Sequence, residues 1–335
     1  MIRALQQKSW FFNACLIGII VVTALLSGMF GQVDLSASQV ARALFVAADD
    51  PATIIVRDLR LPRVLLAVLA GASLGYAGAA LQGLLRNPLA DPGVIGVSAT
   101  ASLGAVIAIY MGLAALSPIA IPVAAMSGAF GATAILMLLA SRDASVLTLI
   151  LAGIGISSLA TAAMSLVMNF TPNPVTVQEM VMWMLGSLEN RTFEDLMLAG
   201  PFILLGWLVM VGTGQGLNAL SLGEEAAQTL GVDLKRLRWR VVLGTALSVG
   251  ATVSVCGAVG FVGLVVPHMV RAFLGYEPRR LLLPSAFLGA ILMMLADILT
   301  RLPIGHGQLR LGVVMAIIGA PVFLYIVFKT RESMR

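Results

Sequence analysis

The sequence has 335 residues, of which 59% are hydrophobic and only 11% are charged, and its mean hydropathy is +0.99. Soluble globular proteins carry about 25% charged residues, so this composition cannot build a water-soluble surface. The net charge of +5 does not indicate nucleic-acid binding, because basic residues of membrane proteins mark the cytoplasmic side of the bilayer. The composition therefore predicts a membrane protein and excludes a soluble globular one.

Long apolar stretches indicate how the chain crosses the bilayer. A helix needs about 20 apolar residues to span the hydrocarbon core, whereas outer-membrane barrels use short strands of alternating polarity. Residues 1–31 lack a small-residue cleavage motif, so the first stretch is expected to be a retained span. We expect one all-α, polytopic domain over 1–335 with about ten transmembrane helices, at roughly 10–31, 63–84, 94–112, 118–140, 145–168, 195–213, 238–257, 259–272, 281–300 and 310–328.

The number of crossings depends on the glycine-rich stretch 241–270. If that stretch crosses twice and the N-terminus is cytoplasmic, two thirds of the 21 Lys and Arg residues lie in the cytoplasm. If it crosses once, these residues are divided almost equally between the two sides of the membrane. The positive-inside rule thus favours ten spans with both termini cytoplasmic. The Gly/Ala-rich regions 70–80 and 244–263 then run in opposite directions, as an inverted repeat predicts, although close helix packing explains the same glycines.

The cytoplasmic segment 217–240 is expected to form a compact elbow. Ser221 followed by Glu224 fits a capping box at a helix start, and Gly231 can end that helix in a left-handed conformation. Asp233 then begins a second helix, which enters the next span through four basic residues. Such an elbow suits docking on a partner, but an ordinary interfacial loop with basic anchors fits the same residues.

Five motifs occur in register from about Leu59 to Phe328: Arg60-Leu61-Pro62-Arg63, Asn87-Pro88-Leu89-Ala90-Asp91-Pro92-Gly93, Gly260-Phe261-Val262-Gly263-Leu264-Val265-Val266-Pro267-His268, Leu295-Ala296-Asp297, and Gly312-Val313-Val314 with Ile318-Gly319-Ala320-Pro321. In these motifs the chain resembles the permease subunits of type II ABC importers, which take up ferric siderophores, haem or cobalamin. The resemblance implies an inverted-repeat, ten-span subunit in the bacterial inner membrane. It also implies several partners: a second permease copy, two cytoplasmic ATPase subunits, a periplasmic substrate-binding protein and the membrane lipid, but no nucleic acid.

The resemblance assigns the elbow to coupling with the ATPase, through Leu222, Gly223, Glu224, Glu225, Ala226, Ala227, Gly231 and Leu234. A separate ATPase agrees with the sequence itself. A phosphate-binding loop needs Gly-Lys-Ser/Thr, and none of the three lysines, at positions 8, 235 and 329, follows a glycine. We therefore expect ATP and Mg²⁺ to bind to the partner. This chain is expected to be no enzyme, to hold no cofactor, and to have no metal site, since two cysteines within apolar spans cannot build one.

Four arginines are candidates for docking the binding protein at the outer face. By resemblance, Arg60, Arg63 and Arg301 pair with acidic residues on its two lobes, which suits the planar guanidinium fork. Headgroup anchoring is the alternative, or for Arg301 an ion pair with Asp297 one helical turn earlier. Arg310 departs from the Glu-Leu-Pro pattern of the family. It fits substrate contact, a wider docking surface, or a snorkelling interfacial side chain.

The translocation path has candidates on the fifth span, because the resemblance implies that the fifth and tenth spans line it. Ser157, Thr161, Met164 and Met168 share one face of that span, although helix packing explains the hydroxyls equally well. The family's cytoplasmic gate matches Ser145, Val146 and Leu147. The two histidines, His268 and His306, are interpreted as interfacial hydrogen-bonding residues rather than haem ligands.

We therefore interpret the chain as the permease subunit of an ATP-driven importer that carries an iron chelate, a ferric siderophore or haem, from periplasm to cytoplasm. The same machinery carrying cobalamin is the alternative. An ion-coupled secondary transporter would need buried acids as coupling sites, and Asp297 is the one clear candidate. An intramembrane protease is disfavoured, because the chain has no H-E-x-x-H motif and no clear nucleophile–base pair.

Overall fold

The computed structural model describes residues 2–31, 33–46, 50–141, 146–302 and 309–333, and these ranges form helices joined by short turns. Seven helices are long and apolar enough to cross a membrane, and three shorter apolar helices, Val97–Tyr110, Val262–Leu274 and Leu311–Tyr325, accompany them among the described residues. Together they are ten. The expected all-α membrane fold is confirmed.

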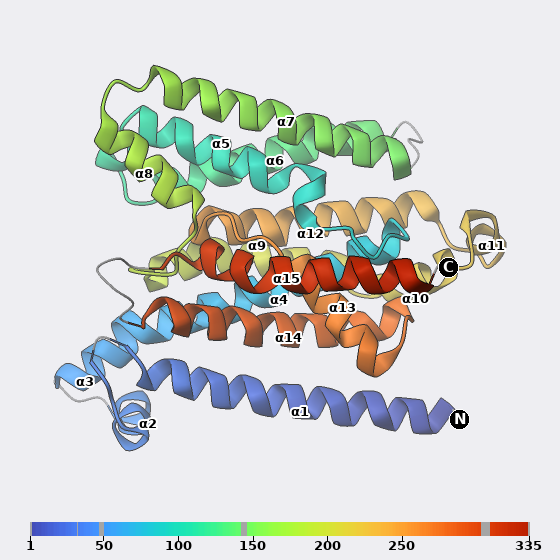
Figure 1. Ribbon diagram of the computed structural model, residues 1–335, viewed down its shortest axis with the longest axis horizontal. Coiled ribbons are helices and arrows are strands. Elements are labelled where there is room, and N and C mark those ends of the chain that lie inside the picture. The colour runs from blue at the N-terminus through green and yellow to red at the C-terminus, as the bar shows by residue number, and fades with distance from the viewer. Residues whose placement is uncertain (1, 32, 47–49, 142–145, 303–308, 334–335) are drawn as a thin grey trace.

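The helices lie side by side along the long axis of the molecule (Figure 1). Their bounds are α1 Ile2–Met29, α2 Ala37–Phe45, α3 Pro51–Ile54, α4 Leu61–Leu84, α5 Val97–Tyr110, α6 Ala120–Ser141, α7 Val146–Phe170, α8 Pro174–Met184, α9 Phe193–Met210, α10 Thr213–Leu220, α11 Glu224–Thr229, α12 Leu234–Cys256, α13 Val262–Leu274, α14 Pro278–Thr300 and α15 Leu311–Ser333. A π-helical segment, Ile55–Arg60, joins α3 to α4 without a break.

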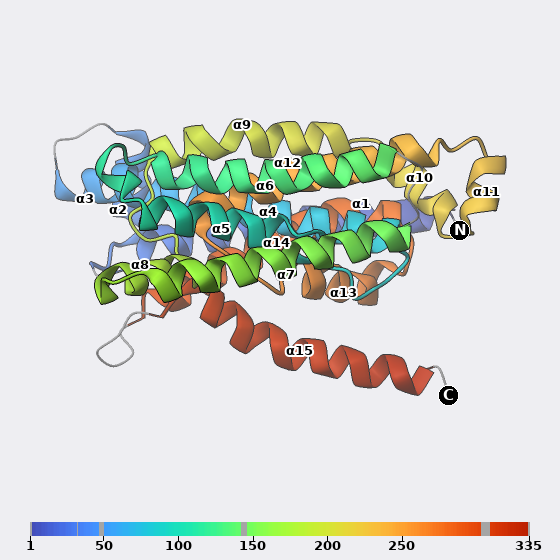
Figure 2. The ribbon, with the colours of Figure 1, turned by 90° about the horizontal axis from the view of Figure 1, so that it is seen from above.

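The two ends of the bundle differ. Both chain termini and α11 lie at one end, which we call the elbow end, while α2 and α3 lie at the opposite end (Figure 1). In the second view α15 diverges from the rest of the bundle (Figure 2). This arrangement separates the predicted elbow from the predicted docking arginines by the length of the bundle.

Helices α4 and α14 pack backbone to backbone. A Cβ atom added at Gly75 would lie 2.1 Å from the carbonyl oxygen of Ser285, and one added at Gly71 would lie 2.2 Å from that of Gly289. Small residues four apart on both helices allow this approach, as in other close membrane-helix pairs. This close pair contacts α1, α12 and α13 as well, and it forms one part of the helix core.

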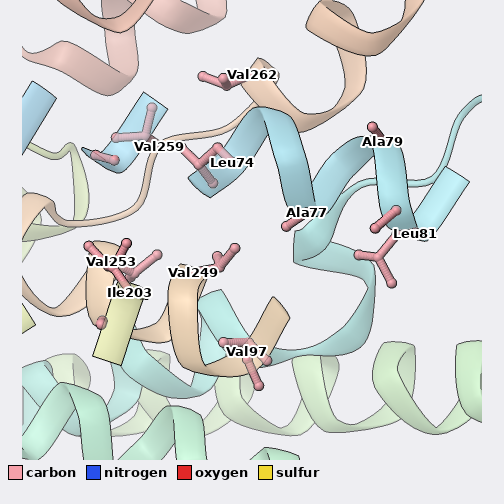
Figure 3. Close-up of a cluster of buried hydrophobic side chains, with 14 of the residues drawn as sticks. Leu74, Ala77, Ala79, Leu81, Val97, Ile203, Val249, Val253, Val259 and Val262 are labelled. Carbon is pink, nitrogen blue, oxygen red and sulfur yellow. The ribbon is translucent and has the colours of Figure 1, made fainter. Parts of the chain in front are cut away.

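The core surrounds this pair of helices. Leu74 and Ala77 of α4, Val249 and Val253 of α12, and Val262 of α13 meet in one cluster of buried side chains (Figure 3). The backbone turns sharply between α12 and α13, where Gly257 has φ +72° and Phe261 has φ +69°. This turn divides the glycine-rich stretch into two helices.

Helix α8, like α2 and α3, has no counterpart among the expected spans. Helix α8 follows α7 after a short turn, and its N-terminus is capped by Asn173, whose Oδ1 accepts a hydrogen bond of 3.0 Å from the N–H of Val175. Pro174 occupies the first helical position, where its missing N–H costs nothing. The Asn-Pro pair is the sequence signal for this helix.

Candidate functional site

The elbow consists of α10, α11 and the start of α12, and α11 projects beyond the other helices (Figures 1 and 2). Gly231 has φ +81° and ends α11. The N–H of Val232 donates to the carbonyl oxygen of Ala227 at 3.0 Å, and that of Gly231 donates to Gln228 at 2.9 Å. These two bonds satisfy carbonyl groups that a helix end leaves unpaired, so the left-handed cap expected at Gly231 is confirmed.

The capping box expected at Ser221 is wrong. Ser221 has helical backbone angles at the end of α10, and its hydroxyl donates to the carbonyl oxygen of Asn218 at 2.6 Å. Gly223, with φ +114°, is the residue that precedes α11. A capping residue needs an extended backbone, and the end of α10 prevents this at Ser221. At α12, Asp233 does cap the helix by accepting from the N–H of Arg236 at 2.9 Å.

The predicted coupling residues divide into two groups. Ala227 is fully buried and Leu234 is 6% exposed, so both attach the elbow to the bundle. Glu224 is held by Arg238 at 2.9 Å, which ties α11 to α12. Leu222, by contrast, is 70% exposed and Glu225 also faces outward.

Leu230 is 64% exposed and was not among the predicted coupling residues. It lies at the opposite end of α11 from Leu222, so two apolar side chains flank this projecting helix. Whether these two leucines contact a partner belongs to the functional proposal below. The sequence signal was a leucine placed directly before the terminating glycine.

Arg60 does not lie on an open outer surface. Its side chain is 7% exposed, and its guanidinium donates to the carbonyl oxygens of Gly28 at 2.6 Å, of Met29 at 2.8 Å and of Val33. These oxygens belong to the end of α1 and the turn after it. In this structure Nη1 and Nη2 of Arg60 cap the end of α1, and the docking role expected for Arg60 stays a prediction.

Arg63 and Arg301 converge on one carboxylate. Asp297 is 1% exposed, accepts from Nη2 of Arg63 at 2.8 Å and from its Nε at 3.0 Å, and also pairs with Arg301. Arg301 further donates to the carbonyl oxygen of Ser27 at 2.7 Å and to its hydroxyl at 2.9 Å. The cluster thus joins α1, α4 and α14 at the end opposite the elbow.

This ion cluster carries one net positive charge in a largely desolvated position. Burial lowers the pKa of Arg301, and the adjacent Asp297 carboxylate opposes that shift, so the guanidinium stays charged as arginines do. The alternative reading of Arg301, an ion pair with Asp297, is what the structure contains. Arg63 keeps 17% of its side chain exposed, and it is the more accessible of the two.

Arg310 lies at the same end, 3.7 Å from Glu189 between Nη1 and Oε2, with both side chains about one quarter to one third exposed. Glu189 belongs to the segment between α8 and α9. This segment also contacts α15 through the backbone, since the N–H of Leu311 donates to the carbonyl oxygen of Gly186 at 3.1 Å. The backbone bond holds the start of α15 against this segment, and Arg310 beside it stays partly exposed.

The predicted path stripe on α7 is only partly on an open face. Thr161 is exposed and Ser157 is half-buried, whereas Met164 is 5% exposed and packs with Val106, Ile109 and Met180. Met164 is therefore a packing residue in this structure, which corrects its assignment as path lining. Met164 is buried mainly because α7 packs against α5, which carries Val106 and Ile109, while α8 adds Met180.

Other hydroxyl residues occupy the open face of α7. Ser158 and Ser165 are exposed and flank Thr161, and each of the three donates to a carbonyl oxygen one turn earlier, at 2.9, 3.0 and 2.8 Å respectively. Their oxygen lone pairs remain available to water or substrate. The open polar stripe thus shares Thr161 with the predicted one but is rotated from it by about 60° around the helix axis.

Some predicted positions cannot be placed. Ser145 and His306 lie outside the described residues, and of Val146 and Leu147 only the backbone is described, at the start of α7. Among the residues that the structure describes, no three His, Cys, Asp or Glu side chains gather closely enough to hold a metal ion.

Comparison with known proteins identifies the family of this chain. Residues 19–329 match the FecCD transport family. The chain belongs to the FecCD transport family. It is 38% identical to the vitamin B12 import system permease protein BtuC of Vibrio cholerae, covering 98% of this chain and 97% of that protein. It is 35% identical to the hemin transport system permease protein HmuU of Yersinia pestis, covering 94% of each.

A solved structure agrees with the fold. It is described as an inward-facing conformation of a metal-chelate type ABC transporter, and it matches with a TM-score of 0.84 at 32% identity, covering 95% of this chain and 98% of that one. This FecCD chain is therefore a multi-pass permease of the type II ABC importer class. The resemblance identified from five motifs is confirmed.

Proposed function

We propose that this FecCD permease carries an iron chelate, a ferric siderophore or haem, from the periplasm across the bacterial inner membrane into the cytoplasm, driven by ATP hydrolysis in a separate subunit. The observation that carries the proposal is the projecting α11 on a chain with no phosphate-binding loop. Such a chain needs a separate ATPase partner, and the projecting α11 offers that partner a surface to dock on.

The elbow end faces the cytoplasm in this proposal, and so do both chain termini. Leu222 and Leu230 enter an apolar cleft of the ATPase, with Glu225 beside them, and ATP and Mg²⁺ stay in that partner. Glu224 contributes indirectly, because its ion pair with Arg238 fixes the angle between α11 and α12. Gly223 and Gly231, both with positive φ, provide the two turns that let α11 project.

A second copy of the chain completes the path. Helix α15 stands away from the bundle (Figure 2), and Ile317 and Phe328 on it are 65% and 64% exposed. The open face of α7 carries the hydroxyls of Ser158, Thr161 and Ser165. In the homodimer the path runs between α7 and α15 of the two copies, with the α7 hydroxyls as weak polar contacts for the passing substrate.

A periplasmic binding protein docks at the opposite end. Arg63 and Arg310 are its contacts in this proposal, since each keeps part of its guanidinium exposed. Arg301 helps to hold Arg63 in position, because both guanidinium groups pair with the carboxylate of Asp297. Planar guanidinium groups suit acidic side chains of a partner.

Cobalamin is the second candidate substrate, favoured by the full-length match to a vitamin B12 permease. Haem is favoured by the match to a hemin permease, which covers 94% of each chain. Uptake into proteoliposomes containing the permease, its ATPase and its binding protein separates them, with labelled cyanocobalamin, haemin and a ferric siderophore as probes. We expect ATP-dependent uptake of one iron chelate. Uptake of cyanocobalamin alone would replace the iron proposal, and uptake driven by a proton gradient without ATP would overturn the importer mechanism.

A further inference from the structure

Asn218 connects the elbow to the bundle through both ends of its side-chain amide. Its Nδ2 donates to Oε1 of Glu277 at 2.8 Å, and its Oδ1 accepts from the backbone N–H of Arg279 at 2.7 Å. Asn218 lies on α10, one turn before the projecting segment, while Glu277 and Arg279 form the first turn of α14. The two elements are about 60 residues apart in sequence, so this is a tertiary contact.

The surrounding contacts hold the two elements in one relative position. Glu277 also pairs with Arg280 at 2.5 Å, so its carboxylate cannot turn away freely. A Cβ atom added at Gly214 of α10 would lie 3.1 to 3.3 Å from atoms of Arg279, and one added at Gly83 of α4 would lie 3.3 Å from Pro278 and 3.5 Å from Leu217 of α10. Helix α10 therefore packs tightly against the N-terminus of α14, and Asn218 fixes the register of that packing.

The Asn218 contact lies between the projecting α11 and helix α14, which reaches the opposite end of the bundle. On one side, the carbonyl oxygen of Asn218 accepts from Ser221, which leads into Leu222 and α11. On the other side, α14 packs on α4 at Gly75 and carries Asp297 in its last turn, where it pairs with Arg63. A rigid helix with a defined contact at each end transmits displacement better than a loose one, because packed elements move as bodies.

We propose that Asn218 is a positioning residue that locks the coupling elbow to α14, so that movement of the elbow is passed to α14 rather than absorbed in the turn. This inference rests on the proposed coupling function of the elbow. An asparagine is required because the site needs a donor toward Glu277 and an acceptor toward the Arg279 N–H. Aspartate supplies only the acceptor and places a second carboxylate at hydrogen-bond distance from Glu277.

The test uses three variants and one control in the complete transporter with its ATPase and binding protein. N218D removes the donor and repels Glu277, E277Q keeps an acceptor for Asn218, and the double variant N218D/E277Q restores a donor–acceptor pair with the donor on residue 277. Q215E is the control, because Gln215 is exposed on the same helix and undergoes the same amide-to-carboxylate change. Uptake per ATP hydrolysed is measured in proteoliposomes, with whichever of labelled cyanocobalamin, haemin or ferric siderophore the wild type transports.

We expect N218D to lower uptake per ATP at least about fivefold while the ATPase still co-purifies and its KM for ATP is unchanged. E277Q and Q215E should stay near the wild type, and N218D/E277Q should recover most of the loss. Hydrogen exchange of backbone amides 217–232 supplies a readout that needs no substrate, and it should rise in N218D and return in the double variant. Equal uptake per ATP in N218D and Q215E, or no recovery in the double variant, would overturn the inference.

A replacement variant and the wild-type result distinguish a failure of this inference from a failure of the proposed function. If N218D does not assemble, E277A carries the test, since it leaves the bond between Asn218 and the Arg279 N–H in place and should give a smaller loss in the same direction; no loss there would count against the inference. If wild-type uptake needs an ion gradient and no ATPase, the proposed function itself fails. If the wild type is ATP-driven and N218D stays coupled, only the role of Asn218 fails.

Discussion

Asp297 accepts from two guanidinium groups while only 1% of its side chain is exposed. The spacing of four residues made the pair with Arg301 predictable, because side chains one turn apart on a helix meet. The pair with Arg63 was not predictable, since the two residues are separated by 234 positions. A lone buried acid in a membrane helix resembles an ion-coupling site, but here the two arginines hold it as a structural carboxylate.

Replacing Asp297 with asparagine leaves the buried guanidinium of Arg301 and the partly buried one of Arg63 without their counter-charge. Removing one partner of a buried ion pair costs roughly 3–5 kcal/mol, so D297N should markedly lower the apparent unfolding temperature in detergent. The matched control is D58N, because Asp58 is exposed on the π-helical segment beside the cluster. Equal unfolding temperatures for D297N and D58N would contradict the structural role given to this cluster.

Arg60 shows that a sequence motif can locate a residue in the fold without predicting its hydrogen-bond partners. The Arg-Leu-Pro-Arg motif located the right end of the molecule, and both of its arginines are there. The sequence could not show that the two side chains point to different partners, Arg60 to carbonyl groups of α1 and Arg63 to Asp297. That distinction depends on how α1 packs, which a single sequence does not specify.

Helices α4 and α14 show how glycine spacing decides packing at the scale of the element. The glycines of α4 were readable from the sequence as either an inverted repeat or a close-packing surface, and the structure uses them for packing. Gly75 and Gly78 each leave room for a backbone carbonyl oxygen, of Ser285 and of Gly263 respectively. Such approaches allow weak Cα–H···O contacts and dense dispersion contacts between the backbones.

A methyl group at Gly75 should therefore separate the two helices. G75A places a Cβ atom 2.1 Å from a backbone oxygen that cannot move alone, and overpacking of this kind costs roughly 1–3 kcal/mol or more. G131A is the control, because nothing lies within 4 Å of a Cβ atom there and alanine favours a helix by about 1 kcal/mol over glycine. Thermal unfolding in detergent should show a loss for G75A alone; equal stability of the two variants would refute the packing account.

The elbow illustrates what the sequence could and could not show of an element. Gly231 and Asp233 were identifiable because a left-handed cap and an N-cap each have a strong residue preference. The start of α11 was misjudged, since the Ser221–Glu224 spacing fits a capping box only when the serine is not already the end of another helix. Leu230 was missed because exposure is a property of the folded elbow.

The two exposed leucines lead to a prediction about partner binding. L222S/L230S should weaken ATPase binding about tenfold or more, at roughly 1 kcal/mol for each truncated contact, without changing the unfolding temperature. F45S is the control, because Phe45 is 87% exposed at the opposite end of the bundle. Retention of the ATPase on the immobilised permease, measured against its concentration, should fall only for the elbow variant. Equal retention for both would place the ATPase contact elsewhere.

At the scale of the whole molecule, hydropathy and charge were sufficient for the class of fold. They predicted helices at ten places, and the seven long and three short apolar helices correspond in number among the described residues. They could not predict α8, which is short and lies between spans, and they could not show that α7 packs its methionine side against α5. The dimer face is likewise beyond the sequence of one chain, because apolar residues facing lipid and apolar residues facing a second copy look alike.

Purification of the tagged chain from its own host in mild detergent, with mass spectrometry of the proteins that accompany it, tests the central claim most directly. The account predicts one ATPase subunit for each permease chain, and a binding protein when the complex is loaded. The same preparation in vesicles should take up substrate only with ATP. Recovery of the chain alone, active in vesicles under an ion gradient without ATP, would contradict the account.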